Sequence, residues 1–248
     1  MKIEAVILAA GKGTRMKSDK PKVLHEINGK SMVEWIIETV KPVCSDINIV
    51  TGFASALVEN QIEEKYNGEI KFSYQKEQDG TGGAVRAAVS NLSGNTTHVI
   101  ICAGDTPLLK TETFSKMIDH FIQTGSDITV VTTILPDAGH YGRIYRDEND
   151  DVAGIVEYLD ADESQLKIKE INSGIYFVEK NLLVEAVYKI KNNNNKREYY
   201  LTDIIKISRF LNRKVTAFIE EDHESLTGIN DIEQLKKAEI AMKKKNSI

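Results

Sequence analysis

Cationic side chains gather in a glycine-containing loop close to the N-terminus. The segment Leu8 to Met16 reads L-A-A-G-K-G-T-R-M and directly follows a short apolar run. Gly11 and Gly13 allow the backbone to approach a phosphate closely, so that N–H groups of the loop can point at its oxygens. Lys12 and Arg15 add positive charge, and arginine can bind a phosphate through two N–H groups at once. This combination predicts a phosphate-binding loop.

Two well-known phosphate motifs do not match this loop. A Walker A loop needs lysine and then serine or threonine after its last glycine, but here Lys12 lies between the two glycines. A dinucleotide-binding loop needs a third glycine at the position of Met16. A tight turn that merely carries exposed cations is the simpler alternative, and the loop by itself leaves it open.

Two further polar residues lie at positions where they could contact a phosphate and a metal ion. Lys22 follows Pro21, which stiffens the chain shortly after the loop. Asp105 follows the apolar run 98–102, at the carboxyl end of an expected strand, where open α/β sheets bind ligands. A carboxylate at this position is suited to hold Mg²⁺ against a triphosphate. The alternative is that Asp105 is a helix-capping residue before Pro107.

The composition excludes several classes of protein. The chain has 248 residues, a net charge of -5 and a pI near 5.7, so we expect neither nucleic acid nor a membrane surface as a partner. No window approaches the roughly 20 apolar residues of a membrane span, and the first apolar run is too short for a signal peptide. Two distant cysteines and five scattered histidines match no disulfide framework or transition-metal pattern. We expect a cytoplasmic protein that acts on small molecules, and its oligomeric state has no signature in the sequence.

Apolar runs and amphipathic segments alternate through the first half of the chain. Strands are expected at 4–8, 46–50, 70–74, 98–102 and 128–133, and helices at 31–40, 54–66, 83–92 and 111–124. Repeated strand–helix units predict an α/β fold, with a Rossmann-like, mostly parallel sheet and helices on both of its faces.

The pattern changes after Pro136. The segments 141–145 and 152–156 flank a polar stretch and predict a hairpin, and together with the extended run 170–178 they predict a small antiparallel lobe over one end of the sheet. The asparagine run 192–195 predicts a solvated loop. A helix is expected at 201–211, a strand at 215–219 and a helix at 231–243. We expect one domain over 1–248, made of a nucleotide-binding part (1–135), a part with the lobe (136–230) and a C-terminal helix (231–248).

Longer motifs carry a family resemblance. L-A-A-G-x-G-T-R-M at 8–16, P-K-x-L at 21–24 and Q-x-E-Q-x-G-T-G at 75–82 resemble segments of the sugar nucleotidyltransferases. The same holds for Y-G-R-I at 141–144 and E-Y-Y-x-T-D at 198–203. The resemblance covers nearly the whole chain. More narrowly, it is a resemblance to the N-acetylglucosamine-1-phosphate uridylyltransferase domains of bifunctional bacterial enzymes.

This resemblance implies an enzyme, a UDP-N-acetylglucosamine diphosphorylase. Such an enzyme joins UTP to N-acetylglucosamine 1-phosphate with the help of Mg²⁺ and releases pyrophosphate. Arg15 and Lys22 then become catalytic residues that act on the phosphates, and Asp105 and Asn230 become the metal ligands. The nucleotide contacts implied by the resemblance are Leu8, Ala9, Ala10, Gly11, Lys12, Gly13, Gln75, Gly80, Thr81 and Gly104. Among them, Gln75 and Gly80 read the uracil and Gly104 approaches the ribose.

The sugar-binding lobe is implied to contact the substrate through Gly142, Glu157, Asn172, Tyr200 and Thr202. Arg197 departs from the family pattern, which has glycine at this position. This difference concerns the shape of the loop that the resemblance places near the N-acetyl group of the sugar. Two assigned residues have simpler alternatives. Thr81 could cap the helix that follows it, and Asn230 could cap the final helix.

Other functions stay open at this point. A related transferase could use another base or another sugar, although Ala9-Ala10 in place of a Gly-Gly pair favours the uridylyl branch by resemblance. A non-catalytic regulator that binds a UDP-sugar would not need the metal ligands. A dinucleotide-dependent oxidoreductase lacks its glycine at Met16. Hexapeptide repeats are absent from the sequence, so we do not expect the left-handed β-helix acetyltransferase domain of the bifunctional enzymes.

Overall fold

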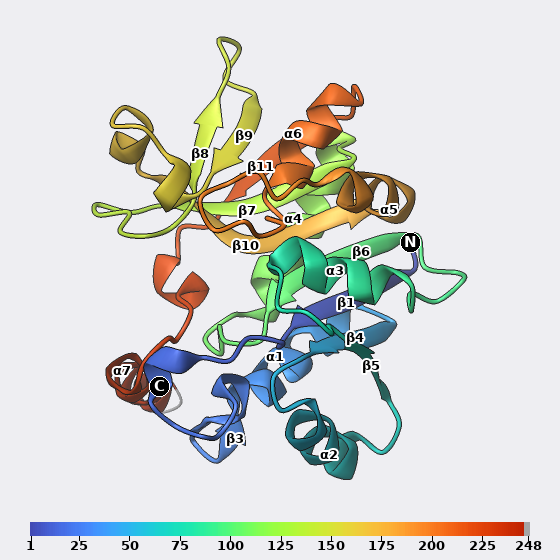
Figure 1. Ribbon diagram of the computed structural model, residues 1–248, viewed down its shortest axis with the longest axis vertical. Helices are drawn as coiled ribbons and strands as arrows, with labels where there is room; N and C mark the ends of the chain where they lie inside the picture. Colours follow the sequence, from blue (N-terminus) through green and yellow to red (C-terminus); the bar gives the residue numbers. More distant parts are fainter. Residues whose placement is uncertain (246–248) are drawn as a thin grey trace.

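A computed structural model describes residues 1–245 and has a large nine-stranded sheet covered by helices (Figure 1). The strands of this sheet are β1 (Ile3–Leu8), β4 (Asp46–Thr51), β5 (Ile70–Tyr74), β6 (His98–Ala103), β7 (Ile128–Ile134), β8 (Arg143–Arg146), β9 (Val152–Val156), β10 (Glu170–Glu179) and β11 (Val215–Ile219). A separate pair consists of β2 (Glu26–Ile27) and β3 (Lys30–Ser31). The helices are α1 (Met32–Val40), α2 (Ser55–Tyr66), α3 (Thr81–Val89), α4 (Thr111–Thr124), α5 (Lys180–Lys189), α6 (Asp203–Phe210) and α7 (Ile232–Lys245). Residues 246–248, which the sequence assigns to the final helix, lie outside the described residues.

The sheet is mostly parallel, as the sequence predicts. Its strand order is β11-β7-β10-β6-β1-β4-β5. β1 pairs in parallel with β4 and β6, β4 pairs in parallel with β5, and β11 pairs in parallel with β7. The carboxyl ends of β1, β4, β5 and β6 therefore meet at one edge, where an open α/β sheet binds its ligands.

The antiparallel lobe is smaller than the sequence analysis predicts. Much of β10 lies inside the main sheet, where Tyr176 to Val178 pair in antiparallel fashion with both β6 and β7. Only the hairpin of β8 and β9 branches away, through the pairing of Ile171 with Arg143 (Figure 1). A register shift between Asn172 and Tyr176 breaks the pairing of β10 with β7. The local pattern of an extended run does not reveal which strand it will pair with. The sequence therefore predicts β10 in the lobe, whereas the structure has it in the main sheet.

Helices cover both faces of the sheet, and alternate residues of each strand face opposite layers. In β1, Ala5 and Ile7 belong to one buried core with residues of α1, α2 and α4. Val6 belongs to a second core with residues of α3, α5 and α6. A third, smaller core of Ile27, Met32, Ile229, Ala238 and Met242 holds α7 against β2 and the start of α1. No helix within residues 1–245 is long and apolar enough to cross a membrane.

The sequence patterns predict no helix at the position of α5. This helix buries Leu182, Leu183, Ala186 and Val187, a spacing that is typical of one helix face. Its first turn is capped by Glu179, whose carboxylate accepts hydrogen bonds from the backbone N–H groups of residues 181 and 182 at 2.9 Å. Because β10 runs directly into this cap without a glycine or proline between them, the sequence shows no break.

Candidate active site

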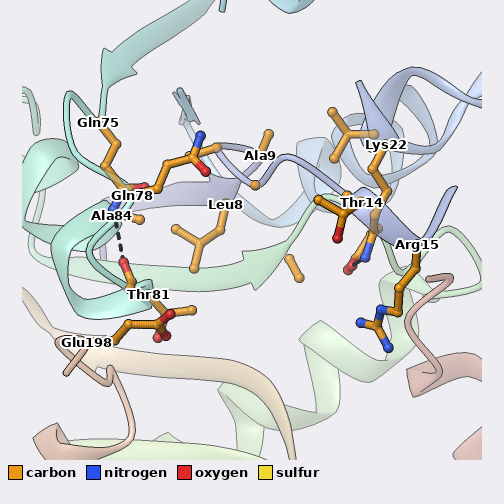
Figure 2. A pocket seen from close by; sticks show the side chains of 17 residues that line it. Leu8, Ala9, Thr14, Arg15, Lys22, Gln75, Gln78, Thr81, Ala84 and Glu198 are labelled. Carbon is orange, nitrogen blue, oxygen red and sulfur yellow. Dashed lines mark hydrogen bonds and ion pairs between the residues drawn. The ribbon is translucent and has the colours of Figure 1, made fainter. Parts of the chain in front are cut away.

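A cavity of about 450 Å³ lies at the carboxyl ends of the parallel strands. Figure 2 shows Gln75, Gln78 and Thr81 around one end of it, Arg15 and Lys22 at the other, and Leu8 between them. Of the residues predicted from the sequence, the cavity is lined by Leu8, Ala9, Ala10, Gly11, Gly13, Arg15, Lys22, Gln75, Gly80, Thr81 and Asp105. One elongated site therefore collects residues from the first loop, the segment before α3 and the end of β6.

The glycine-containing loop leaves its backbone donors available. Within residues 1–245, the N–H groups of residues 11, 12 and 13 donate to no other protein group. Gly13 has a φ of 62°, and a Cβ atom at this position would overlap the side chain of Lys22. Around Gly11 the space is open, because a Cβ atom there would meet nothing within 4 Å. The loop can thus approach an anion with free N–H groups.

Three distant segments converge on one cluster of charges at the cationic end of the cavity. The ammonium group of Lys22 forms an ion pair with the carboxylate of Asp105 and donates to Asn230 Oδ1 at 2.8 Å. Arg15 Nη2 donates to the same oxygen, also at 2.8 Å. A carboxylate, an amide oxygen and two cationic side chains are therefore joined in one network of contacts.

The amide of Asn230 is held in a defined orientation. Its Nδ2 atom donates to the carbonyl of Gly228 at 3.1 Å, so its Oδ1 atom faces the cations. The backbone N–H of Ile229 donates to the carbonyl of Asp105 at 2.8 Å and joins the two segments. The helix α7 is capped by Asp231, whose Oδ1 accepts from the N–H of residue 234 at 2.8 Å. The alternative that Asn230 caps this helix is therefore wrong.

Gln75 is almost fully buried at the other end of the cavity, with 6% of its surface exposed. Its Nε2 atom donates to Asp79 Oδ1 at 2.9 Å and to the carbonyl of Gly80 at 3.0 Å. Gly80 has a φ of 112°, and a Cβ atom there would come within 2.6 Å of the carbonyl oxygen of Tyr199. Only glycine fits both the backbone conformation and the close contact.

The segment around Tyr199 is attached to this end of the cavity. Tyr199 donates its N–H to the carbonyl of Asp79 at 2.7 Å and accepts from the N–H of Gly82 at 2.7 Å. Thr81 is the first residue of α3, and its hydroxyl accepts from the N–H of Leu201 at 3.1 Å. The capping position belongs to Gly80, so Thr81 does not cap the helix as the alternative holds.

The residues predicted to bind the sugar form a second group. Thr202 donates to Glu157 Oε1 at 3.1 Å, and Glu157, Tyr200 and Thr202 line a cavity of about 150 Å³. Asn172 donates its N–H to the carbonyl of Gly142 at 2.9 Å. Burial raises the pKa of the Glu157 carboxyl, and it raises the pKa of the Tyr200 hydroxyl to about 12 with the help of the charges of Asp160 and Glu157.

Tyr141 connects this second group with the charge cluster. Tyr141 is half-buried. Burial, followed by the charge of Asp105, raises the pKa of its hydroxyl, while hydrogen bonds with Gly228 and Thr227 act in the opposite direction. The next residue along the chain is Gly142, which bonds to Asn172. In the sequence, Tyr141 stands out only as part of the Y-G-R-I motif. Its role as a neighbour of Asp105 depends on the fold of the hairpin.

Two of the predicted nucleotide contacts, Lys12 and Gly104, do not line the large cavity. The ammonium group of Lys12 lies over the ring of Phe53, 5.4 Å from its centre, and does not join Arg15 and Lys22. Gly104 donates its N–H to the carbonyl of Leu8 at 2.9 Å, so it joins the ends of β6 and β1. Conversely, the cavity lining includes Glu198 and Gln78, which the sequence analysis does not assign to the site.

The asparagine run 192–195 is predicted to be a solvated loop, but in the structure two of its residues are hydrogen-bonded to other parts of the protein. Asn194 Nδ2 donates to the carbonyl of Glu198 at 2.6 Å, and its Oδ1 accepts from the N–H of the same residue at 3.1 Å. Asn195 Nδ2 donates to the carbonyl of Leu159, and its N–H donates to Asp160 Oδ1 at 3.0 Å. Although the run is largely exposed, two of its amides attach it to the segments beside the smaller cavity.

Arg197 adopts the backbone conformation of the glycine that the family pattern has at this position. Its φ is 55°, and its side chain is exposed. We expect Arg197→Gly to raise the free energy of unfolding by up to about 1 kcal/mol, because glycine removes the left-handed strain at a smaller entropic cost. Arg197→Ala keeps the strain and serves as the control. Urea unfolding of both variants checks this, and an equal gain in both would assign the effect to the arginine side chain.

Comparisons with known proteins agree with this geometry. The MobA-like NTP transferase domain family matches residues 5–154. The chain is 42% identical over 242 residues to the bifunctional protein GlmU of Caldanaerobacter subterraneus subsp. tengcongensis, a match that covers 97% of this chain and 52% of the relative. It is also 42% identical over 246 residues to the bifunctional protein GlmU of Clostridioides difficile, covering 99% and 52%. The chain therefore spans about half the length of the curated relatives it matches.

Solved structures show the same fold at lower identity. The 4-diphosphocytidyl-2C-methyl-D-erythritol synthase of Anaerococcus prevotii superposes with a TM-score of 0.69 and 21% identity, over 98% of both chains. HddC of Yersinia pseudotuberculosis, complexed with GMP-PN, has the same TM-score and identity over 96% of this chain and 99% of its own. The resemblance inferred from the motifs is confirmed by the family match and by the curated relatives.

Proposed function

The chain belongs to the MobA-like NTP transferase domain family, and on this basis we propose that it transfers a uridylyl group from UTP to N-acetylglucosamine 1-phosphate. The products would be UDP-N-acetylglucosamine and pyrophosphate. Membership of the family makes the chain a nucleotidyltransferase, whereas the base and the sugar are our proposal. They are supported by the motifs of the sequence and by 42% identity to proteins named bifunctional protein GlmU.

One observation carries the proposal. A single elongated cavity has Gln75 and Gly80, an amide and a backbone group, at one end and the charges of Arg15, Lys22 and Asp105 at the other. Gly11 and Gly13 of the first loop also line this cavity, and within residues 1–245 their N–H groups donate to no protein group. A nucleoside triphosphate has this polarity, because its neutral base and its polyanion lie at opposite ends of the molecule.

The chemistry then rests on placement and on charge. The phosphate oxygen of the sugar phosphate is already an anion at neutral pH, so it needs no general base. It attacks the α-phosphorus of UTP, a new P–O bond forms, and the bond to the β-phosphate breaks as pyrophosphate leaves. Arg15 and Lys22 stabilise the negative charge that develops on the phosphate oxygens. The first loop holds the phosphates in line through its N–H groups.

The residues at the cationic end fit a magnesium ion. Asp105 and Asn230 offer one carboxylate and one amide oxygen, the type of ligand that Mg²⁺ prefers. Both oxygens already converge on one cation, the ammonium group of Lys22. Residues 1–245 contain no group of three or more His, Cys, Asp or Glu side chains suited to a metal, and Mg²⁺ in such sites is held by few protein ligands together with phosphates. When bound, the ion neutralises phosphate charge and polarises the reacting phosphorus.

We assign Glu157 to a hydroxyl of the sugar, together with Thr202 and Asn172. Since burial raises its pKa in the folded state above the unfolded value, the folded chain takes up this proton more readily. Its contribution to stability is present at low pH and is lost as the pH rises through the raised pKa. We expect Glu157→Gln to raise the melting temperature more at pH 7 than at pH 4.

The same substitution should weaken the sugar site. We expect Glu157→Gln to raise KM for the sugar phosphate while KM for the nucleotide stays nearly constant, because the acceptor for the sugar hydroxyl loses its charge. Glu163→Gln, an exposed change in the neighbouring loop, is the control for both measurements. Thermal unfolding at the two pH values and steady-state kinetics check the pair of expectations. An unchanged sugar KM would remove Glu157 from the sugar site.

The proposed reaction is tested by pyrophosphate release with Mg²⁺ and a panel of substrates. UTP is compared with CTP, dTTP, GTP and ATP, and N-acetylglucosamine 1-phosphate with glucose 1-phosphate. Release that is fastest with UTP and the N-acetyl sugar, and that a chelator abolishes, supports the proposal. Preference for another pair would change the assigned substrates. Binding of UDP-sugars without any release would favour a regulator over an enzyme.

A further inference from the structure

The hydrogen bonds of Gln75 determine which atom of its side chain can read a base. One terminal atom of its amide lies 2.9 Å from Asp79 Oδ1 and 3.0 Å from the carbonyl oxygen of Gly80. An ionised carboxylate and a backbone carbonyl can only accept hydrogen bonds. The atom between them must therefore be the nitrogen, which uses both of its hydrogens there.

The other terminal atom of the amide, Oε1, is then an acceptor with no donor. Within residues 1–245 no protein group donates to it. Gln75 lines the cavity, so this oxygen is the group it offers to a ligand. Gly80 lines the same wall, and its backbone N–H donates to no protein group among the described residues. The cavity thus presents an acceptor and a donor side by side.

This pair matches one edge of uracil. Uracil has an N–H at position 3 with a carbonyl oxygen on each side, so it can donate to Gln75 and accept from Gly80. Cytosine has a bare acceptor nitrogen at position 3, and this nitrogen would face Gln75 Oε1 with no hydrogen between them. A buried pair of facing acceptors costs about as much as an unmade hydrogen bond.

Asp79 is held so firmly that it can impose this orientation. Its backbone carbonyl accepts from the N–H of Tyr199 at 2.7 Å. Its carboxylate lies against Gly83 in the first turn of α3, where any Cβ atom would overlap Oδ1. A negative charge beside a helix N-terminus is also favoured by the helix dipole. In the motif of the sequence analysis this position is variable, so the motif assigns no role to Asp79.

We propose that Asp79 is a specificity-determining residue, which positions Gln75 as an acceptor and thereby selects a pyrimidine with an N–H at position 3. The inference rests on the proposed function, because it assumes that the base lies at the end of the cavity with Gln75 and Gly80. Asp79 acts through Gln75 and needs no contact of its own with the substrate. Its removal should change the choice of base more than the rate.

The experiment compares Asp79→Ala with Asp79→Asn. The kcat/KM values for UTP and CTP are measured for both variants and for the unchanged chain, together with direct binding of each nucleotide without sugar phosphate. We expect Asp79→Ala to reduce the ratio of UTP to CTP about tenfold, because a charge-assisted hydrogen bond that fixes the amide is lost. Asp79→Asn should keep the ratio within about twofold, since its amide oxygen can still accept from Gln75.

The two variants also separate this role from a structural one. Both remove the charge at the start of α3, so a loss that is equal in both variants would overturn the proposal. UTP methylated at N3 should bind poorly to the unchanged chain, and its disadvantage against UTP should shrink in Asp79→Ala. An unchanged ratio in Asp79→Ala, with the unchanged chain preferring UTP, would overturn the role of Asp79 alone. Preference of the unchanged chain for a purine would overturn this role and the proposed function together.

Discussion

Asp105→Asn is expected to lower kcat/KM for pyrophosphate release by about a hundred- to a thousandfold. The substitution keeps the size of the side chain but removes the negative charge that faces Lys22 and, in our proposal, holds Mg²⁺. Losses of this size are typical when one central electrostatic group of a catalytic site is removed. Steady-state kinetics at saturating Mg²⁺ measure the loss, and a titration of metal concentration should show weaker activation of the variant.

The control for this prediction is Asp119→Asn. Asp119 is exposed on α4, so its substitution changes the net charge by the same amount without touching the cavity. We expect the control to keep its activity within about twofold, as surface changes usually do. Both variants should unfold at nearly the temperature of the unchanged chain. Near-normal turnover of a folded Asp105→Asn protein would contradict the metal assignment.

Arg15→Ala is expected to lower kcat about a hundredfold while KM for the sugar phosphate changes little. Arg15 lines the cavity at the charge cluster, where it donates to Asn230, and in our proposal it contacts the phosphates. An interaction that is made mainly in the transition state affects kcat more than KM. Arg15→Lys should recover part of the activity, because lysine supplies the charge without the two-pronged geometry.

Lys17→Ala serves as the matched control for Arg15. Lys17 follows Arg15 closely in the chain and is exposed, and it lines no part of the cavity. Its removal changes the general electrostatic attraction of the loop but not the reacting centre. If Arg15→Ala instead raised KM for the sugar phosphate and left kcat intact, Arg15 would belong to the sugar side of the site.

The strand–helix alternation and the first loop could be predicted because their causes are local. Buried strands such as β1 and β6 are short apolar runs. In the helices, apolar residues recur at the spacing of one helix face. The motifs also name residues of both ends of the cavity. Gly13 illustrates a local cause at the site, because its left-handed backbone and its contact with Lys22 both demand glycine.

Other features depend on contacts that no local sequence pattern records, so they could not be predicted. The insertion of β10 between β6 and β7 is a choice of neighbour that no local pattern records. Lys12 was expected at the phosphates, but its side chain turns to the ring of Phe53. Asp79 gains its importance only when Gln75 is folded against it. In each case the contact that determines the outcome exists only in the folded structure, so the sequence pattern does not predict it.

The position of Asn230 has a consequence for how the protein responds to heat. Asn230 directly precedes Asp231, the cap of α7. Among the described residues, that helix belongs to the small core of five buried residues and to neither of the two large ones. Structural units with small cores open locally at a lower free energy than the whole molecule needs to unfold. Each such opening would withdraw the Asn230 oxygen from Arg15 and Lys22 while the sheet stays intact. Inactivation on warming would then precede melting, and the gap between the two temperatures would report the strength with which α7 is docked.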